Sequence, residues 1–186
     1  AALPPGAAEG STPILCVEPA YVDRDYRYGV SGPDTPDNPE RFAFLARAAL
    51  GWARSTRYDV IHGHDWQAGL VPVLLRREFA SDPILGAIPT VFTIHNLAYQ
   101  GTFWHLDMPL TGLDWRLFNF EQLEFHGRLH FLKAGLVFAD LLSTVSPPFP
   151  LDIHPPTFPP GLPPLLPGPA PHPRPLVPRL PPPPPL

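Results

Sequence analysis

The chain has 186 residues and a formal net charge of −4 at pH 7, from 17 acidic and 13 basic side chains. Because nucleic acids and anionic membranes attract clustered Lys and Arg, this dispersed and weakly acidic composition argues against both as partners. No apolar run approaches the ~20 residues that a membrane span requires. Residues 1–12 lack the features of a secretory signal and are expected to be a disordered stub.

The first expected element is a short strand at residues 14–17, within the apolar run Ile-Leu-Cys-Val. Its Cys16 is the only cysteine of the chain, and we interpret it as a buried strand residue. Residues 21–39, rich in Asp, Gly and Pro, indicate a loop. A helix is predicted to follow to about residue 55, with Pro39 in its first turn. The expected apolar face of this helix contains Phe42, Leu45, Ala49 and Trp52.

The middle of the chain contains two predicted strands and the helix between them. The first strand covers residues 58–62 and leads to a helix at 66–79, which Asp65 is placed to cap. The inward face of this helix should contain Leu70, Val73 and Leu74. The second strand covers residues 89–95, after the break at Ser81-Asp-Pro83.

A long amphipathic helix at residues 114–138 and a last strand at 139–145 complete the predicted domain, which extends over residues 13–147. Near-continuous apolar strands that alternate with helices indicate an α/β fold with a Rossmann-like parallel sheet and flanking helices. Beyond residue 147 the composition changes, because 20 of the 31 prolines lie in the last 40 residues. We expect residues 148–186 to be a disordered, Pro-rich tail.

Polar side chains follow two of the predicted strands. His62, His64 and Asp65 stand at the end of the first, and His95 and Asn96 at the end of the second. Parallel strands bring their carboxyl ends to the same edge of a sheet, which is where open α/β folds bind ligands. We therefore expect His95 and Asp65 to project into one shared crevice.

Residues 62–70 (HGHDWQAGL) and 93–101 (TIHNLAYQG) resemble two signature segments of the bacterial glycogen synthases and plant starch synthases. Residues 36–44, 124–136 and 139–147 resemble further segments of the same family in the same order. The resemblance implies the N-terminal half of a two-domain GT-B glucosyltransferase. It also implies transfer of glucose from ADP-glucose to the non-reducing end of an α-1,4-glucan, although the sequence leaves UDP-glucose open as the donor.

The resemblance assigns roles to several residues of this sequence. It implies that His95 lies beside the transferred glucose and that Asp65 serves the active cleft, so these two are the catalytic candidates. The expected substrate-binding residues are Asn96, Tyr28, His64, Trp66, Tyr99 and Gln100. For Trp66 a sugar-stacking role and simple packing under the first helical turn stay equally open. Gly101 is expected to permit a turn with positive φ.

Two other kinds of site are alternatives to these roles. His62 and His64 alternate onto one strand face beside Asp65, a set that can bind a metal, but the family is not known to hold one here. Glu121 and Glu124 would share a face of the long helix, where we expect them to be solvated or paired with Arg128 rather than catalytic. We expect neither a metal nor another cofactor.

The family's first strand with its Gly-rich loop, and its second domain, have no counterpart in this sequence. The chain is therefore expected to be an internal piece of a synthase that is inactive by itself. A non-catalytic glucan-binding module, or an interaction protein acting through its Pro-rich tail, are the alternatives. Location in the bacterial cytoplasm is expected, or in the plastid for a plant protein.

Overall fold

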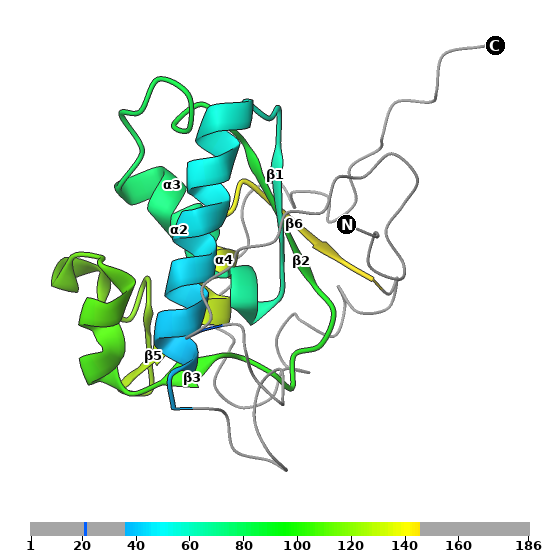
Figure 1. Ribbon diagram of the computed structural model, residues 1–186. Coiled ribbons are helices and arrows are strands. Elements are labelled where there is room, and N and C mark those ends of the chain that lie inside the picture. The colour runs from blue at the N-terminus through cyan, green and yellow to red at the C-terminus, as the bar shows by residue number, and fades with distance from the viewer. Residues whose placement is uncertain (1–20, 22–35, 146–186) are drawn as a thin grey trace.

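The computed structural model describes Tyr21 and residues 36–145 (Figure 1). The predicted strand at 14–17, Tyr28 and the Pro-rich tail lie outside the described residues.

The larger sheet is parallel, with strand order β1-β2-β6. Its strands are β1 (Ile61–His64), β2 (Thr90–Ile94) and β6 (Leu141–Thr144), and its helices are α2 (Asn38–Thr56), α3 (Leu70–Arg77) and α4 (Phe131–Phe138), as Figure 1 shows. Three successive parallel strands joined by helices confirm the predicted α/β fold. The strand order advances in one direction, so right-handed crossovers place α3 and α4 on the same face.

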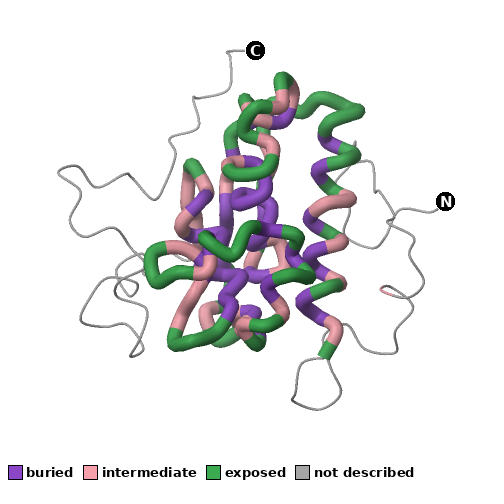
Figure 2. Tube along the Cα trace, turned by 90° about the vertical axis from the view of Figure 1, so that its left-hand side faces the viewer, coloured by how far each residue is buried: buried purple, intermediate pink, exposed green. Residues whose placement is uncertain are grey.

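A second, antiparallel sheet has the order β3-β5-β4. It lies between β2 and α4 in the chain, and its elements are β3 (Thr102–Phe103), the 3-10 helices η2 (His105–Thr111) and η3 (Trp115–Leu117), β4 (Glu124–Phe125) and β5 (Arg128–His130). Figure 2 shows that buried residues concentrate where the helices and sheets meet, while the outer turns are exposed.

The packing of α4 on the parallel sheet depends on a glycine. A Cβ atom on Gly135 would come within 2.3 Å of the Phe92 ring, so only glycine lets helix and strand approach this closely. Phe92 is completely buried, and Leu142 pairs with it from β6. This face of the sheet therefore carries the apolar core, and the opposite face carries the polar side chains described below.

The buried face of α2 differs from the predicted one. Leu45 and Trp52 are 40% and 43% exposed, while the buried positions are Phe42, Ala43, Ala46, Leu50 and Ala53. Three alanines on that face let α2 pack closely against its neighbouring helices, and close packing outweighs the area that Leu45 and Trp52 would have buried. Only Phe42 of the predicted face is in the core.

The predicted helix at 114–138 is wrong. Only its last third is helical, and a β-hairpin made of β4 and β5 precedes it. The hairpin loop is His126-Gly127, with φ of 49° and 74°, and positive φ at both loop residues is the geometry of tight hairpins. Glu121 and Glu124 therefore do not share a helix face. Instead of pairing with Arg128, Glu124 accepts a hydrogen bond from the amide of Gly127 through its carboxylate.

A buried lysine holds this hairpin to α4. Lys133 is 1% exposed, and its ammonium donates to the carbonyl oxygens of Phe120 and, at 2.7 Å, of Glu124. Burial lowers its pKa, and the nearby Glu124 opposes that shift. Beside it, His130 is fully buried and caps α4 by accepting from the Lys133 amide. Burial lowers the pKa of His130 to about 4, so its ring is neutral at pH 7.

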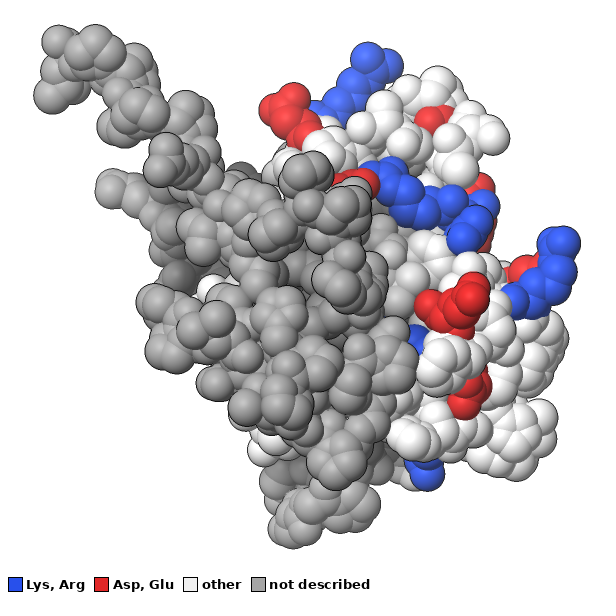
Figure 3. Space-filling model, turned by 180° about the vertical axis from the view of Figure 1, so that it is seen from behind, with Lys and Arg blue, Asp and Glu red and all other residues white. Residues whose placement is uncertain are grey.

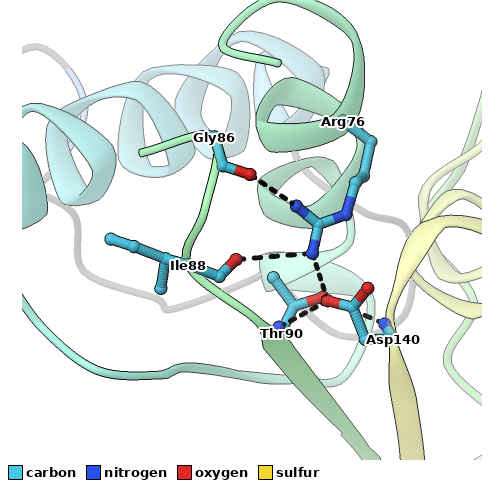
Figure 4. Close-up of polar contacts among 5 residues, drawn as sticks. All are labelled: Arg76, Gly86, Ile88, Thr90 and Asp140. Carbon is cyan, nitrogen blue, oxygen red and sulfur yellow. Dashed lines mark hydrogen bonds and ion pairs between the residues drawn. The ribbon is translucent and has the colours of Figure 1, made fainter. Parts of the chain in front are cut away.

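An ionic cluster ties the amino ends of β2 and β6 to the end of α3 (Figure 4). The Asp140 carboxylate accepts from the Thr90 amide at 2.7 Å, from the Thr90 hydroxyl at 2.9 Å, and from Arg76. Burial alone would raise the pKa of Asp140, but the hydrogen bonds from Thr90 and Arg76 outweigh it and lower the pKa. Arg76 also donates to the carbonyls of Gly86 and Ile88.

We expect Asp140→Ala to lower the free energy of unfolding by about 1–3 kcal/mol at pH 7, because Thr90 is buried and loses its acceptor. Since the folded-state pKa of Asp140 is lowered, its contribution is present above the unfolded pKa and is lost as the pH falls through the folded one. Urea unfolding at pH 7 and pH 3 measures both effects. Asp59→Ala, at an exposed aspartate, is the matched control; equal losses in the two variants would contradict the prediction.

Lys and Arg side chains stand among Asp and Glu side chains on the face shown in Figure 3. Among the described residues, no helix is both long and apolar enough to cross a membrane.

Candidate functional site

His95 and Asp65 are in direct contact at the carboxyl edge of the parallel sheet. The Asp65 carboxylate accepts from the His95 amide at 2.7 Å and contacts the His95 Nδ1 atom at 2.9 Å. Since a carboxylate only accepts, Nδ1 carries the proton, and Nε2 is directed away from Asp65. The imidazole is 43% exposed and the carboxylate 27%. The two side chains therefore lie together, as the sequence predicted.

The backbone of Asp65 adopts a conformation that few non-glycine residues have, with φ 56° and ψ −174°. Its amide continues the sheet by donating to the Thr93 carbonyl, so β1 ends in a sharp turn. This conformation costs of order 1–3 kcal/mol, and such residues cluster at functional sites. Asp65 makes no side-chain cap to η1 (Trp66–Ala68), so its predicted capping role is wrong. The carboxylate is aimed at His95 instead.

The elements around Asp65 differ from the predicted ones in their bounds. The strand before it is Ile61–His64 rather than 58–62, and the predicted helix 66–79 is the 3-10 helix η1 followed by Leu70–Arg77. The shift places both His62 and His64 within the strand. Leu70, Val73 and Leu74 are buried as predicted.

Three histidine rings form a line leading to the site. The centroids of His62 and His64 are 4.1 Å apart, and those of His64 and His95 are 5.3 Å apart. The pKa of His64 is lowered, first by burial and then by repulsion from His62 and His95, against the opposing effect of Asp65. His64 is therefore neutral at pH 7. The short distance between the His62 and His64 rings confirms that these two residues share one face of β1.

Two hydroxyl groups extend the line of histidines across the sheet. The His62 ring contacts the Thr93 hydroxyl at 2.6 Å, and Thr93 contacts the hydroxyl of Ser143 on β6. The sequence did not single out Thr93 and Ser143, because each strand carries a second hydroxyl residue, Thr90 in β2 and Thr144 in β6, and no motif marks one above the other. The available signal was the two-residue period of a strand, which puts Thr93 on the opposite side of β2 from Phe92. Among the described residues, no group of three or more His, Cys, Asp or Glu side chains is arranged to hold a metal.

The predicted substrate residues of the loop after β2 divide into outward and inward groups. Tyr99 is 68% exposed, and Asn96 is exposed while its side chain accepts from the Ala98 amide. Gln100 turns inward, where its amide donates to the Leu97 carbonyl and accepts from His130. Gln100 therefore fixes the loop to the amino end of α4.

Trp66 belongs to the core and not to the surface of the site. It is 3% exposed and packs edge-on against Phe42 and Phe103, with centroids 4.7 and 5.6 Å away. Of the two roles predicted for Trp66, the structure therefore shows packing and not sugar stacking. Gly101 lies against the same ring, since a Cβ atom there would come within 2.4 Å of it. Its φ of 59° is the positive value that the sequence predicted.

Comparison with known proteins gives consistent matches. A family model described as the starch synthase catalytic domain matches residues 5–167. A glycogen synthase from Anaeromyxobacter dehalogenans strain 2CP-C is 50% identical over 151 residues, which cover 79% of this chain and 32% of the relative. Glycogen synthase 2 from Geobacter sulfurreducens is 47% identical over 154 residues, covering 81% of this chain and 32% of that protein.

A solved structure described as the catalytic domain of starch synthase IV from Arabidopsis thaliana, bound to ADP and acarbose, superimposes with a TM-score of 0.60. The two sequences are 30% identical, and the matched region covers 68% of this chain and 26% of the starch synthase IV chain. The chain thus spans about a third of the length of the curated relatives that it matches. Because the family model matches most of its length, the chain belongs to the family of starch and glycogen synthases.

Proposed function

We propose that this chain supplies part of the active site of a retaining glucosyltransferase, which transfers glucose from ADP-glucose to the non-reducing end of an α-1,4-glucan. The observation that carries the proposal is the His95–Asp65 pair at the carboxyl edge of the parallel sheet. The starch synthase IV structure, whose description includes bound ADP and acarbose, supports the same substrate classes. No metal or other cofactor is part of the proposal, and cytoplasmic location is proposed with it.

The pair fits the chemistry of glucosyl transfer. As the nucleotide leaves, the sugar develops an oxocarbenium-like charge, and fixed polar groups that orient its hydroxyls lower the barrier. Asp65 holds the His95 ring by its Nδ1 atom and its amide, so the Nε2 atom is presented in one orientation. His64, neutral and with its ring tilted against that of His95, can bind hydroxyl groups without adding charge. Asn96, Tyr99 and, in the proposal, Tyr28 would border the sugars.

A chimera tests the proposal. Residues 36–145 of this chain replace the matching segment of the Anaeromyxobacter dehalogenans glycogen synthase, its 50% identical relative. We expect the chimera to release ADP from ADP-glucose in a glycogen-dependent manner at a rate within about tenfold of the parent. The 186-residue chain alone, assayed beside a vector control, should give none.

The controls separate a folding failure from a failed proposal. The chimera's thermal unfolding midpoint and its circular dichroism spectrum are compared with those of the parent. A folded chimera without activity would contradict the proposal and would favour a non-catalytic binding module. Turnover by the chain alone would overturn the expectation that this segment is inactive by itself.

A further inference from the structure

The loop that follows β2 is held from the inside by one glutamine side chain. The Gln100 side-chain amide donates to the Leu97 carbonyl at 3.1 Å, and its carbonyl oxygen contacts the His130 Nε2 atom at 3.1 Å. These two contacts join the middle of the loop to the residue that caps α4. We call residues 96–101 the β2 loop and the Gln100–His130 contact the clamp.

The protonation of the clamp follows from the helix cap. The Nδ1 atom of His130 accepts from the Lys133 amide at 3.0 Å, so it carries no proton. The proton of the neutral ring is therefore on Nε2, which donates to the Gln100 carbonyl oxygen. His130 is completely buried, and burial lowers its pKa to about 4, so the ring stays neutral at pH 7. Each nitrogen of the ring thus has one partner, and the clamp has one orientation.

The carboxyl end of the β2 loop is fixed by its backbone as well. The carbonyls of Gln100 and Gly101 accept from the first amides of α4, those of Leu132 at 3.1 Å and Phe131 at 2.9 Å. Gly101 also lies directly against the Trp66 ring. This end of the loop therefore has several anchors besides the Gln100 side chain.

The outward part of the β2 loop depends on side-chain contacts. Asn96, Ala98 and Tyr99 are exposed, whereas Leu97 is partly buried and packs against the core. The Asn96 side chain accepts from the Ala98 amide at 2.9 Å, and Gln100 holds the Leu97 carbonyl. Within the described residues no hydrogen bond holds the Tyr99 side chain, so the position of its ring follows the backbone that Gln100 fixes.

We propose that Gln100 is a positioning residue, which through the clamp holds the β2 loop so that Asn96 and Tyr99 face the sugars bound beside His95. Gln100 itself turns inward and acts on the sugars through the loop. The His95 ring is held by Asp65 from the end of β1, so loss of the clamp should loosen the loop without disturbing that pair. A ligand must then order the loop as it binds, and this entropy cost weakens binding. The choice of sugars as the ligand rests on the proposed function.

Hydrogen exchange of the 186-residue chain tests the clamp itself. Gln100→Met keeps the length of the side chain and removes both of its hydrogen bonds. We expect amide exchange in the β2 loop to accelerate by about fivefold or more relative to exchange in strand β2. Asp140→Ala, at the amino edge of the sheet, is the control, because it should destabilise the chain without a preferential effect on the loop.

Steady-state kinetics of the chimera test the effect on the sugars. We expect Gln100→Met to raise the KM for ADP-glucose or for glycogen by about fivefold or more, with kcat within about threefold of the unsubstituted chimera. His130→Asn should act in the same direction, because asparagine still caps α4 but is too short to reach Gln100. If both residues act through one contact, the double variant should be no worse than Gln100→Met alone. Asp140→Ala should lower stability and leave both constants unchanged.

The positioning role is wrong if a folded Gln100→Met chain exchanges its β2 loop as slowly as the wild-type chain. It is also wrong if this variant loses kcat with KM unchanged, or if the effects of Gln100→Met and His130→Asn simply add. Thermal unfolding midpoints identify a variant that fails to fold. If Gln100→Met fails to fold, His130→Asn decides by the same criteria. An inactive but folded unsubstituted chimera rejects the proposed function, and the exchange result then decides on the clamp by itself.

Discussion

Replacing His95 by alanine in the chimera is expected to reduce kcat by about 100-fold or more, the effect typical of removing one fixed polar group from a transition-state site. The KM for ADP-glucose should change much less, because the imidazole is proposed to act on the charge that develops during transfer. Steady-state ADP release with glycogen as acceptor measures both constants. Loss confined to KM would contradict the assigned role.

Asp65→Asn in the same chimera separates positioning from chemistry. The amide keeps an oxygen that can accept from the His95 backbone, but it loses the negative charge that holds Nδ1–H. We therefore expect a smaller reduction of kcat than in His95→Ala, about tenfold. Asp59→Asn, at an exposed aspartate just before β1, is the control and should leave both constants unchanged. Equal effects of Asp65→Asn and Asp59→Asn would remove Asp65 from the site.

The largest loss of stability is expected from Lys133→Ala, about 3–5 kcal/mol. The change leaves a cavity where the buried side chain lay and removes the donor to the Phe120 and Glu124 carbonyls. Since small domains are stable by only about 5–15 kcal/mol, this is a large fraction of the total. Urea unfolding of the 186-residue chain, followed by circular dichroism, measures it.

Two further variants divide that loss into its causes. Lys133→Met keeps most of the side-chain volume and also removes the cost of burying a charge, so we expect a loss of about 1–3 kcal/mol from the unpaired carbonyls alone. Arg128→Met, at an exposed basic residue of β5, should be close to neutral. If Lys133→Met were as stable as the wild-type chain, the two carbonyl hydrogen bonds would contribute nothing net.

Local patterns predicted the parts of the fold whose signal lies within a few residues. Apolar runs identified β2 and β6, and Pro39 marked the start of α2. Polar residues directly after parallel strands predicted that His95 and Asp65 meet, because all such strands end at one edge of their sheet. These inferences needed only the pattern of apolar residues, the direction of the strands and the conformational preferences of residues such as proline.

Other features depended on contacts between distant residues. The 3.6-residue period of segment 114–138 could not show that positive φ at His126 and Gly127 turns the chain into a hairpin, with Lys133 satisfying the carbonyls of that turn. The period of the α2 segment likewise could not show which of its faces is buried, because that depends on the elements that pack against the helix.

The sequence by itself determined the family, the α/β class and the two strand ends that form the site. The signal for each of these features lies within short continuous segments of the chain. The tertiary structure alone decided that Asp65 holds His95 instead of capping a helix, and that Trp66 belongs to the core. Side-chain direction and burial depend on what the rest of the chain packs against each residue, and no local pattern carries that information.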